Sequence, residues 1–253
     1  MTTTVPLPSQ AVIAERVPEL DRAAAAFLSG SLVAGFGHAN SDVDVYVCFA
    51  RRDDLERVRA AADVVAEPVS GSPVAVFYAD TVRWDVEFVL AEEIEALIGR
   101  VEALESVEKV PLADPEIDLL YRITVGRPVL GAPLVEAWQE RIAGSPLRAV
   151  LTSRYLDFAD TMLDDALGLL EVGDVHAAAY CARLGFEWAT HALLAADGRI
   201  CPSDKWRIAQ LRNGPAGSIA LDDYLEIVEM RDFDGRRWVE RVVDRAREIA
   251  FEL

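Results

Sequence analysis

The stretch LSGSLVAGFGHANSDVDVYVCF, Leu28 to Phe49, joins a turn of small residues to a run of valines that carries two aspartates. From Ser41 onward the valines alternate with Asp42, Asp44 and Tyr46, which is typical of a β-strand. Asp42 and Asp44 therefore share one face of the predicted strand. Because burying a carboxylate costs several kcal/mol unless something pairs with it, we expect a cation beside these two side chains.

A predicted β-hairpin follows, with arms at 73–79 (PVAVFYA) and 82–90 (VRWDVEFVL). Its second arm places Asp85 and Glu87 on one face. If this arm and the aspartate-bearing strand are neighbours in one sheet, three carboxylates can converge, and carboxylate oxygens are ligands that Mg²⁺ prefers. Two such ions, about 3.5–4 Å apart, can activate an attacking oxygen and stabilise a leaving one in phosphoryl or nucleotidyl transfer.

The Gly30-Ser31 turn lies upstream of the aspartates. Glycine lets a backbone approach a ligand closely, and exposed N–H groups with a serine hydroxyl can cradle phosphates. We therefore expect a phosphate site next to the metal site.

The remaining segments are predicted to be mostly helical. Residues 8–26, apart from Pro18, and 51–63 have helical character, and strand character disappears after Glu92. Further helices are predicted at 92–106, 115–125, 148–171, 174–196 and 221–250. Hinges at 126–134 and 144–146 indicate a boundary near residue 145, which gives a sheet-containing domain at 1–145 and a helical domain at 146–253.

Composition restricts the classes of function. The 253 residues, 52% of them hydrophobic, are enough for a packed core, and no apolar run or basic leader indicates a membrane span or secretion, so we expect a cytoplasmic protein. Cys48, Cys181 and Cys201 have no metal-binding spacing and are expected to be reduced. The net charge of −18 disfavours nucleic acid as a partner and would suit a cationic small substrate.

The Gly30-Ser31 pair, a spacer of ten residues and then Asp42-Val43-Asp44-Val45 resemble the core motif of the polymerase β-type nucleotidyltransferase superfamily. Ser29 departs from the family pattern, which usually has an apolar residue before the glycine. Residues that also fit the small-molecule branch, which contains the antibiotic nucleotidyltransferases, are Gly35, Gly37 and Ser41.

The resemblance implies an α+β fold, with a mixed-sheet nucleotidyltransferase domain followed by an all-α helical bundle. It also implies two Mg²⁺ ions, held by Asp42, Asp44 and a third carboxylate on a later strand, with Gly30, Ser31 and Ser41 at the nucleotide. Asp85 is favoured as the third carboxylate and Glu87 is a close second. Either could serve as the base that deprotonates the acceptor.

The helical half more loosely resembles the helical domain of antibiotic nucleotidyltransferases and of HEPN-type proteins. Lys205, after the predicted N-cap Ser203, is the leading candidate to reach the triphosphate, and Arg183 is the second. For Lys205 an ordinary surface charge is an equal alternative, and for Arg183 an ion pair with Glu187 on the same helix.

The resulting prediction is an enzyme of the nucleotidyltransferase class. It would transfer a nucleoside monophosphate, with AMP from ATP favoured, to a hydroxyl of a small molecule and release pyrophosphate. Two alternatives stay open: AMP transfer to a protein by an antitoxin-type enzyme, and a nucleotide-binding regulatory module without turnover. The acceptor and the oligomeric state are not predicted.

Overall fold

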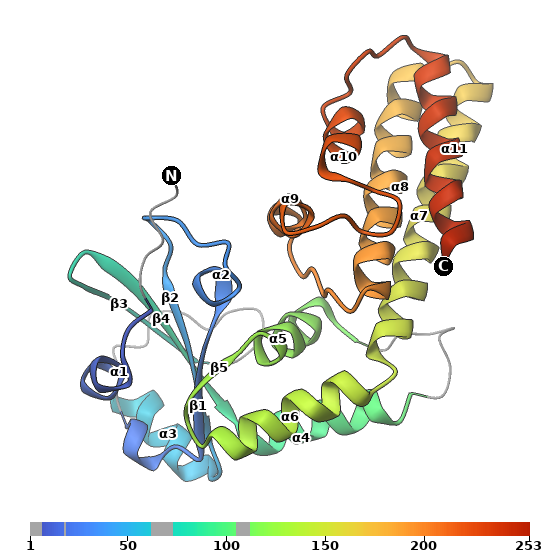
Figure 1. The fold of residues 1–253 in the computed structure, drawn as a ribbon. Helices are drawn as coiled ribbons and strands as arrows, with labels where there is room; N and C mark the ends of the chain where they lie inside the picture. The colour runs from blue at the N-terminus through green and yellow to red at the C-terminus, as the bar shows by residue number, and fades with distance from the viewer. Residues whose placement is uncertain (1–6, 18, 62–72, 105–111) are drawn as a thin grey trace. The chain divides into compact units, whose positions relative to one another are not determined.

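The computed structural model describes residues 7–17, 19–61, 73–104 and 112–253 (Figure 1). The contacts among these residues divide the chain into two compact units. The first contains residues up to Ala103 together with Leu112–Ser145, and the second contains Pro146–Leu253. The sheet lies in the first unit, and the second is helical (Figure 1).

The first unit is built on a five-stranded sheet of order β3-β4-β2-β1-β5. Strands β2 and β4 are parallel, and the other neighbours are antiparallel, so the sheet is mixed. The predicted α+β class is thereby confirmed. The strands are β1 (Ala25–Ser29), β2 (Val43–Phe49), β3 (Val74–Ala79), β4 (Val82–Leu90) and β5 (Arg127–Leu130).

Helices cover both faces of this sheet. The face that carries Val45 and Val47 packs against Ile13 of α1 and Leu55 of α3 in one buried cluster. On the opposite face, the ring of Tyr46 stacks on Phe27 with centroids 5.0 Å apart, and α5 contacts β1. The helices of this unit are α1 (Gln10–Arg16), the 3₁₀ turn η1 (Leu20–Arg22), α2 (Gly30–Val33), α3 (Arg52–Ala61), α4 (Ala91–Glu102), α5 (Asp114–Thr124) and α6 (Ala132–Gly144).

The predicted hairpin is confirmed by the pairing of β3 with β4. Its two linking residues, Asp80 and Thr81, have φ values of 51° and 69°. Two consecutive positive φ angles are the backbone of the two-residue turns that match the twist of antiparallel strands. The turn thus fixes the register that brings Asp85 and Glu87 to their places on β4.

Two strands differ from the sequence-based expectation. Residues 8–26 were expected to be one interrupted helix, but α1 ends at Arg16 and Ala25 begins β1. All five residues of β1 are buried, so the strand has no alternation of polar and apolar residues that would reveal it. The expected hinge at 126–134 contains β5, an edge strand, where Pro128 is tolerated because no further strand needs its missing N–H.

The second unit contains α7 (Leu147–Glu171), α8 (Val175–Ala196), α9 (Asp204–Arg212), α10 (Leu221–Val228) and α11 (Arg236–Glu252). Helices α7 and α8 form a long antiparallel pair (Figure 1). They join at Gly173, whose φ is +83°, and Asp174 caps α8 by accepting a hydrogen bond from the Ala177 N–H. The prediction of a single helix over 221–250 is wrong. Met230, Asp232 and Gly235 take positive φ angles, and this segment separates α10 from α11.

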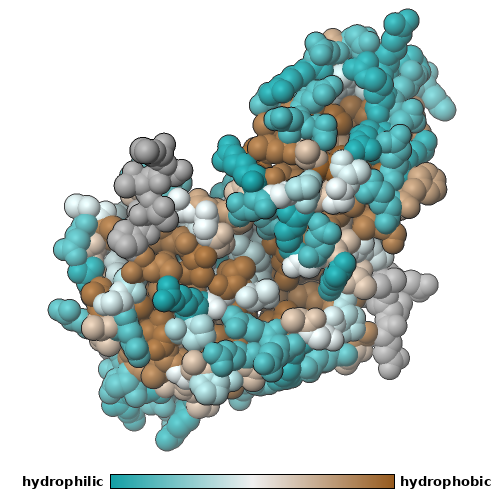
Figure 2. All heavy atoms as spheres, viewed as in Figure 1, coloured by the Kyte–Doolittle hydropathy of each residue, from teal (hydrophilic) through white to brown (hydrophobic). Residues whose placement is uncertain are grey.

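The surface of the helical unit is mainly hydrophilic on the face shown in Figure 2. In Figure 2, hydrophilic residues cover most of its visible outer face, and hydrophobic residues gather between its helices. Helix α11 is an example of this distribution, because Trp238, Val242 and Ile249 are buried on one side of the helix and charged residues occupy the other side. Within the described ranges, no helix has the length and apolar character needed to cross a membrane.

Candidate active site

Three of the four predicted carboxylates lie on one face of the sheet, whereas Asp42 directly precedes β2. In the parallel pairing of β2 with β4, Asp44 is the partner of Asp85 and Tyr46 is the partner of Glu87. Residues in register on parallel strands point to the same side, and so do residues two apart on one strand. Asp44, Asp85 and Glu87 therefore share the side of the sheet opposite the Val45 core.

The short helix α2 begins at Gly30, directly after β1, and we call this start of the helix the Gly30 turn. Its backbone lies directly against the Asp44 carboxylate. Gly30 has φ +75°, and a Cβ placed on it would lie 1.8 Å from the Asp44 Oδ2 atom. A side chain at this position would therefore have to displace the carboxylate. The two halves of the sequence motif are thus in contact through this glycine.

The neighbouring serines have structural partners. Ser29, where the family pattern has an apolar residue, is buried, and its Oγ donates to the Arg122 carbonyl at 2.8 Å. Ser41 is also buried, and its Oγ accepts from the His38 N–H at 2.9 Å. Ser31 is half-buried, and its carbonyl accepts from the Phe36 N–H. These bonds shape the loop between β1 and β2, and the nucleotide contacts of Ser31 and Ser41 stay predictions.

The cation expected beside the aspartates comes from α5. The Nη1 atom of Arg122 lies 3.1 Å from Asp44 Oδ1, and its Nε lies 3.3 Å from Asp118 Oδ2. Both members of the Asp44 pair are mostly buried, at 15% and 17% side-chain exposure. Sequence reasoning missed Arg122. The available signal was its spacing of four residues from Asp118 within a predicted helix, which indicates an ion pair but not the contact with the sheet.

The other two carboxylates also have partners within the chain. Arg83 donates two hydrogen bonds to Asp85, of 2.7 and 2.8 Å, in the two-pronged geometry that suits a guanidinium and a carboxylate. Glu87 accepts a bond of 2.7 Å from the Tyr46 hydroxyl. Burial raises the pKa of the Glu87 carboxyl, and the bond from Tyr46 opposes the rise.

Burial and neighbouring charges both change the ionisation of Asp44. The pKa of its carboxyl is raised from 3.8 to about 6, first because burial disfavours the charge and then because Asp42 and Asp85 lie nearby, while Arg122 acts in the opposite direction. Burial and the neighbouring carboxylates together therefore outweigh the opposing contribution of Arg122. A group with several hard oxygens and surplus negative charge is the chemistry that attracts a divalent cation.

The residue types at this face fit Mg²⁺, whereas their placement shows arginine partners. Within the described residues, no three His, Cys, Asp or Glu side chains are grouped closely enough to hold a metal ion. Asp44 and Asp85 each point an oxygen at a guanidinium instead. The metal-ligand roles of Asp42, Asp44 and Asp85 stay predictions, and a metal would have to replace at least the contact from Arg122.

The two basic candidates of the helical unit lie on different helices. Arg183 of α8 is 3.7 Å from Glu187, which is the alternative foreseen for it, and its guanidinium also lies over the Tyr180 ring. Lys205 is the second residue of α9, and its Nζ lies 5.7 Å from the centre of the Trp206 ring. Their contacts with a triphosphate stay predictions.

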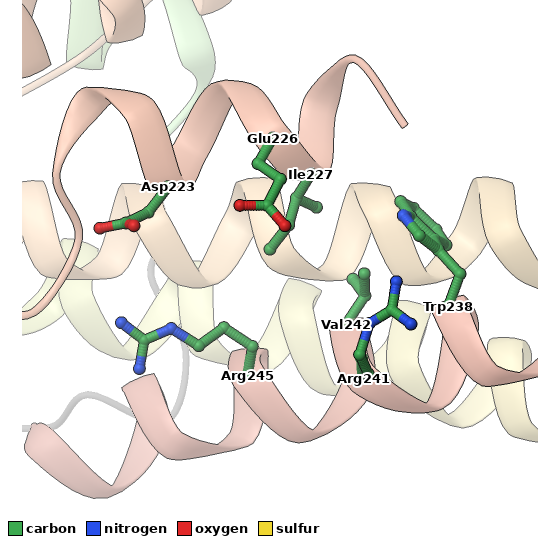
Figure 3. Close-up of a pocket in the computed structure, with 7 residues that line it drawn as sticks. All are labelled: Asp223, Glu226, Ile227, Trp238, Arg241, Val242 and Arg245. Carbon is green, nitrogen blue, oxygen red and sulfur yellow. The ribbon is translucent and has the colours of Figure 1, made fainter. Parts of the chain in front are cut away.

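A shallow groove of about 360 Å³ lies between α10 and α11 in the helical unit. Asp223 and Glu226 on α10 face Arg245 and Arg241 on α11 across it (Figure 3). Its floor is apolar, formed by Ile227, Trp238 and Val242. Acids and arginines balance across this groove, so it offers no surplus of one charge that would attract a metal or a triphosphate.

Comparisons with known proteins give limited information. No protein-family model matches the sequence, and no curated protein matches it. Among solved structures, the chain is similar to a nucleotidyltransferase-like protein from Exiguobacterium sibiricum 255-15, with 11% sequence identity and a TM-score of 0.39. The match covers 96% of this chain and 77% of that one. At such values the likeness carries no information about the activity of this chain.

Proposed function

We propose that the protein is a Mg²⁺-dependent nucleotidyltransferase. It transfers a nucleoside monophosphate to a hydroxyl of a small molecule and releases pyrophosphate, and AMP from ATP is the favoured donor group. The observation that carries the proposal is the contact between the Gly30 turn and Asp44, with Asp85 in register beside it. A glycine turn and two adjacent carboxylates are what a nucleotide phosphate and its metal require.

In the proposed mechanism each residue of the face has a role. Asp42, Asp44 and Asp85 would hold Mg²⁺, which when bound supplies charge neutralisation at the phosphates. Gly30 and Ser31 would place backbone N–H groups against the triphosphate. The attacking hydroxyl gives its proton to a carboxylate, a bond forms between its oxygen and the α-phosphorus, and the bond to the leaving pyrophosphate breaks.

Two carboxylates are suited to accept that proton. Asp85 lies beside Asp44 and is our first choice, and Glu87 is the second. The raised pKa of Glu87, caused by its burial, brings this carboxyl closer to the range in which a general base works. Lys205 and Arg183 are kept from the sequence as the proposed basic contacts of the triphosphate.

A second candidate function is nucleotide binding without turnover. It is favoured by the two ion pairs that engage the carboxylates, Arg122 with Asp44 and Arg83 with Asp85. If these pairs persisted in the presence of nucleotide and Mg²⁺, neither Asp44 nor Asp85 would be available to the metal.

The test measures pyrophosphate release with each of the four NTPs, with and without Mg²⁺, in the presence of a pool of hydroxyl-bearing small molecules that includes cationic ones. The proposal expects release that needs both Mg²⁺ and an acceptor. Tight nucleotide binding by calorimetry with no release for any acceptor would favour the second candidate. No binding of any NTP would contradict both.

A further inference from the structure

One face of the sheet carries Asp44, Asp85 and Glu87, and we call it the carboxylate face. Arg122 lies where this face meets the Gly30 turn. Its Nη1 atom is 3.1 Å from Asp44 Oδ1, and it would be 3.0 Å from a Cβ placed on Gly30. The guanidinium therefore borders the residue proposed to hold a metal and the turn proposed to hold phosphate.

The position of Arg122 is built by three separate elements. Asp118, one turn earlier on α5, lies 3.3 Å from the Arg122 Nε and aligns the side chain. The Ser29 hydroxyl, at the end of β1, donates to the Arg122 carbonyl and ties this turn of α5 to the sheet. Asp44 on β2 holds the tip. A guanidinium fixed from both ends at 17% exposure is not a freely moving surface charge.

The chemistry of the two cations makes them competitors. A Mg²⁺ ion binds a carboxylate oxygen at about 2.1 Å, so a metal on Asp44 Oδ1 would displace the Arg122 Nη1 atom that now lies beside it. Arginine, in turn, presents a planar fork of N–H donors that matches the oxygens of a phosphate as well as those of a carboxylate. If a metal takes Asp44, the N–H groups of Arg122 next to Gly30 become available to a phosphate.

We propose that Arg122 is an exchange cation. In the free protein it neutralises Asp44, and when a nucleotide arrives with its metal, the metal takes Asp44 and Arg122 binds a phosphate oxygen of the nucleotide. Arg122 thereby makes Asp44 a poor ligand for a metal ion alone and a good one for the metal–nucleotide complex. This inference rests on the proposed nucleotide site and assigns a binding residue to it.

The experiment compares Arg122→Gln with the full-length wild type in two titrations. The first uses Mn²⁺ alone, followed by the electron paramagnetic resonance signal of the free ion, because Mn²⁺ shares the preference of Mg²⁺ for oxygen ligands. The second uses Mn²⁺ with an ATP analogue whose α,β bond cannot be cleaved, followed by calorimetry. Arg122→Gln should bind Mn²⁺ alone about ten-fold more tightly and the metal–analogue complex about ten-fold more weakly.

The opposite signs separate this role from a structural one. An arginine needed only for folding would weaken both titrations and lower the melting temperature. The matched control is Arg141→Gln, which removes the same charge from an ion-pair cluster with Glu95 and Glu102 on α4 and should leave both affinities unchanged. If Arg122→Gln proves unfolded by circular dichroism, Arg122→Lys keeps the charge but loses the fork, and it should show both changes to a smaller extent.

Three results would overturn the inference: equal Mn²⁺ affinity in wild type and variant, unchanged affinity for the metal–analogue complex, or changes of the same sign in both titrations. Neither titration measures turnover. A wild type that binds in this pattern but transfers no nucleotide would contradict the proposed function and leave the exchange at Arg122 standing.

Discussion

The carboxylate face of the sheet and the groove between α10 and α11 both combine aspartates or glutamates with arginines. In the groove Arg241 is 55% exposed, and the acids of α10 face the arginines of α11. On the sheet the Arg122 and Asp44 side chains are 17% and 15% exposed, and Asp42 and Asp85 add charge of the same sign. A buried ion pair with additional negative charge beside it, rather than the number of charged residues, therefore distinguishes the candidate site from an ordinary surface.

The largest difference between the two regions is expected for activity. Asp44→Asn should reduce pyrophosphate release to background while the protein stays folded, because it removes an oxygen ligand from the proposed metal site. Glu226→Gln removes one charge from the groove and should leave release within about two-fold of wild type. Wild-type release from Asp44→Asn would contradict the metal assignment.

The next effect separates the two possible bases on β4. Asp85→Asn should lower kcat by about 10²–10⁴-fold, the range typical of lost general-base catalysis, whereas Glu87→Gln should mainly raise KM for the acceptor. Steady-state kinetics of pyrophosphate release gives both parameters. The reverse ranking would transfer the role to Glu87, and near-wild-type values in both variants would remove β4 from the site.

A glycine in each unit tests whether the turn after β1 is special. Gly30 and Gly173 have φ values of +75° and +83°, so alanine at either position pays a similar backbone strain of roughly 1–2 kcal/mol. A Cβ at Gly173 meets nothing within 4 Å, whereas one at Gly30 meets Asp44. Urea unfolding should therefore show a larger loss of stability for Gly30→Ala, and calorimetry should show weaker Mg²⁺–ATP binding for this variant alone. Equal behaviour of the two variants would mean that Asp44 tolerates displacement.

The smallest effect is on stability and depends on pH. Because the folded-state pKa of Asp44 is raised from 3.8 to about 6, the folded protein holds this proton more tightly than the unfolded chain does. Its ionisation destabilises the fold as pH rises through this window, and the penalty is complete above it. In metal-free buffer, Asp44→Asn should be more stable than wild type by roughly 1–3 kcal/mol at pH 7.5, and this gain should disappear near pH 4.

The matched control for this pH series is again Glu226→Gln, which should change the free energy of unfolding by about 0.5 kcal/mol or less. Thermal or urea unfolding at several pH values measures both variants. A destabilised Asp44→Asn at pH 7.5 would show that the ion pair with Arg122 outweighs the cost of burying the charged carboxylate beside Asp42 and Asp85.

Local sequence patterns predicted the strands that show a clear alternation of residues or an apolar run beside a turn. The alternation around Asp42 and Asp44 predicted β2, and the two apolar runs flanking a short link predicted the β3–β4 hairpin. Strand β1 was missed because burial on both faces removes the alternation, and β5 because a short edge strand around Pro128 resembles a loop.

The candidate site was predictable in part for the same reason. The face shared by Asp85 and Glu87 follows from the period of a strand, and the need for a cation follows from the cost of burying carboxylates. That the cation is Arg122 depends on how α5 packs on the sheet. This contact joins distant parts of the chain, and no periodicity in the sequence reports it.

The most direct test of the central claim is the mass of the product. Wild-type protein is incubated with each of the four NTPs in turn, Mg²⁺ and the acceptor pool or a cell extract. The small molecules are analysed by mass spectrometry beside a parallel incubation with Asp44→Asn. The account predicts a small molecule that gains the mass of one nucleoside monophosphate, with Mg²⁺ and Asp44 both required. Absence of any such product with all four NTPs, under conditions in which the wild type binds nucleotide, would contradict it.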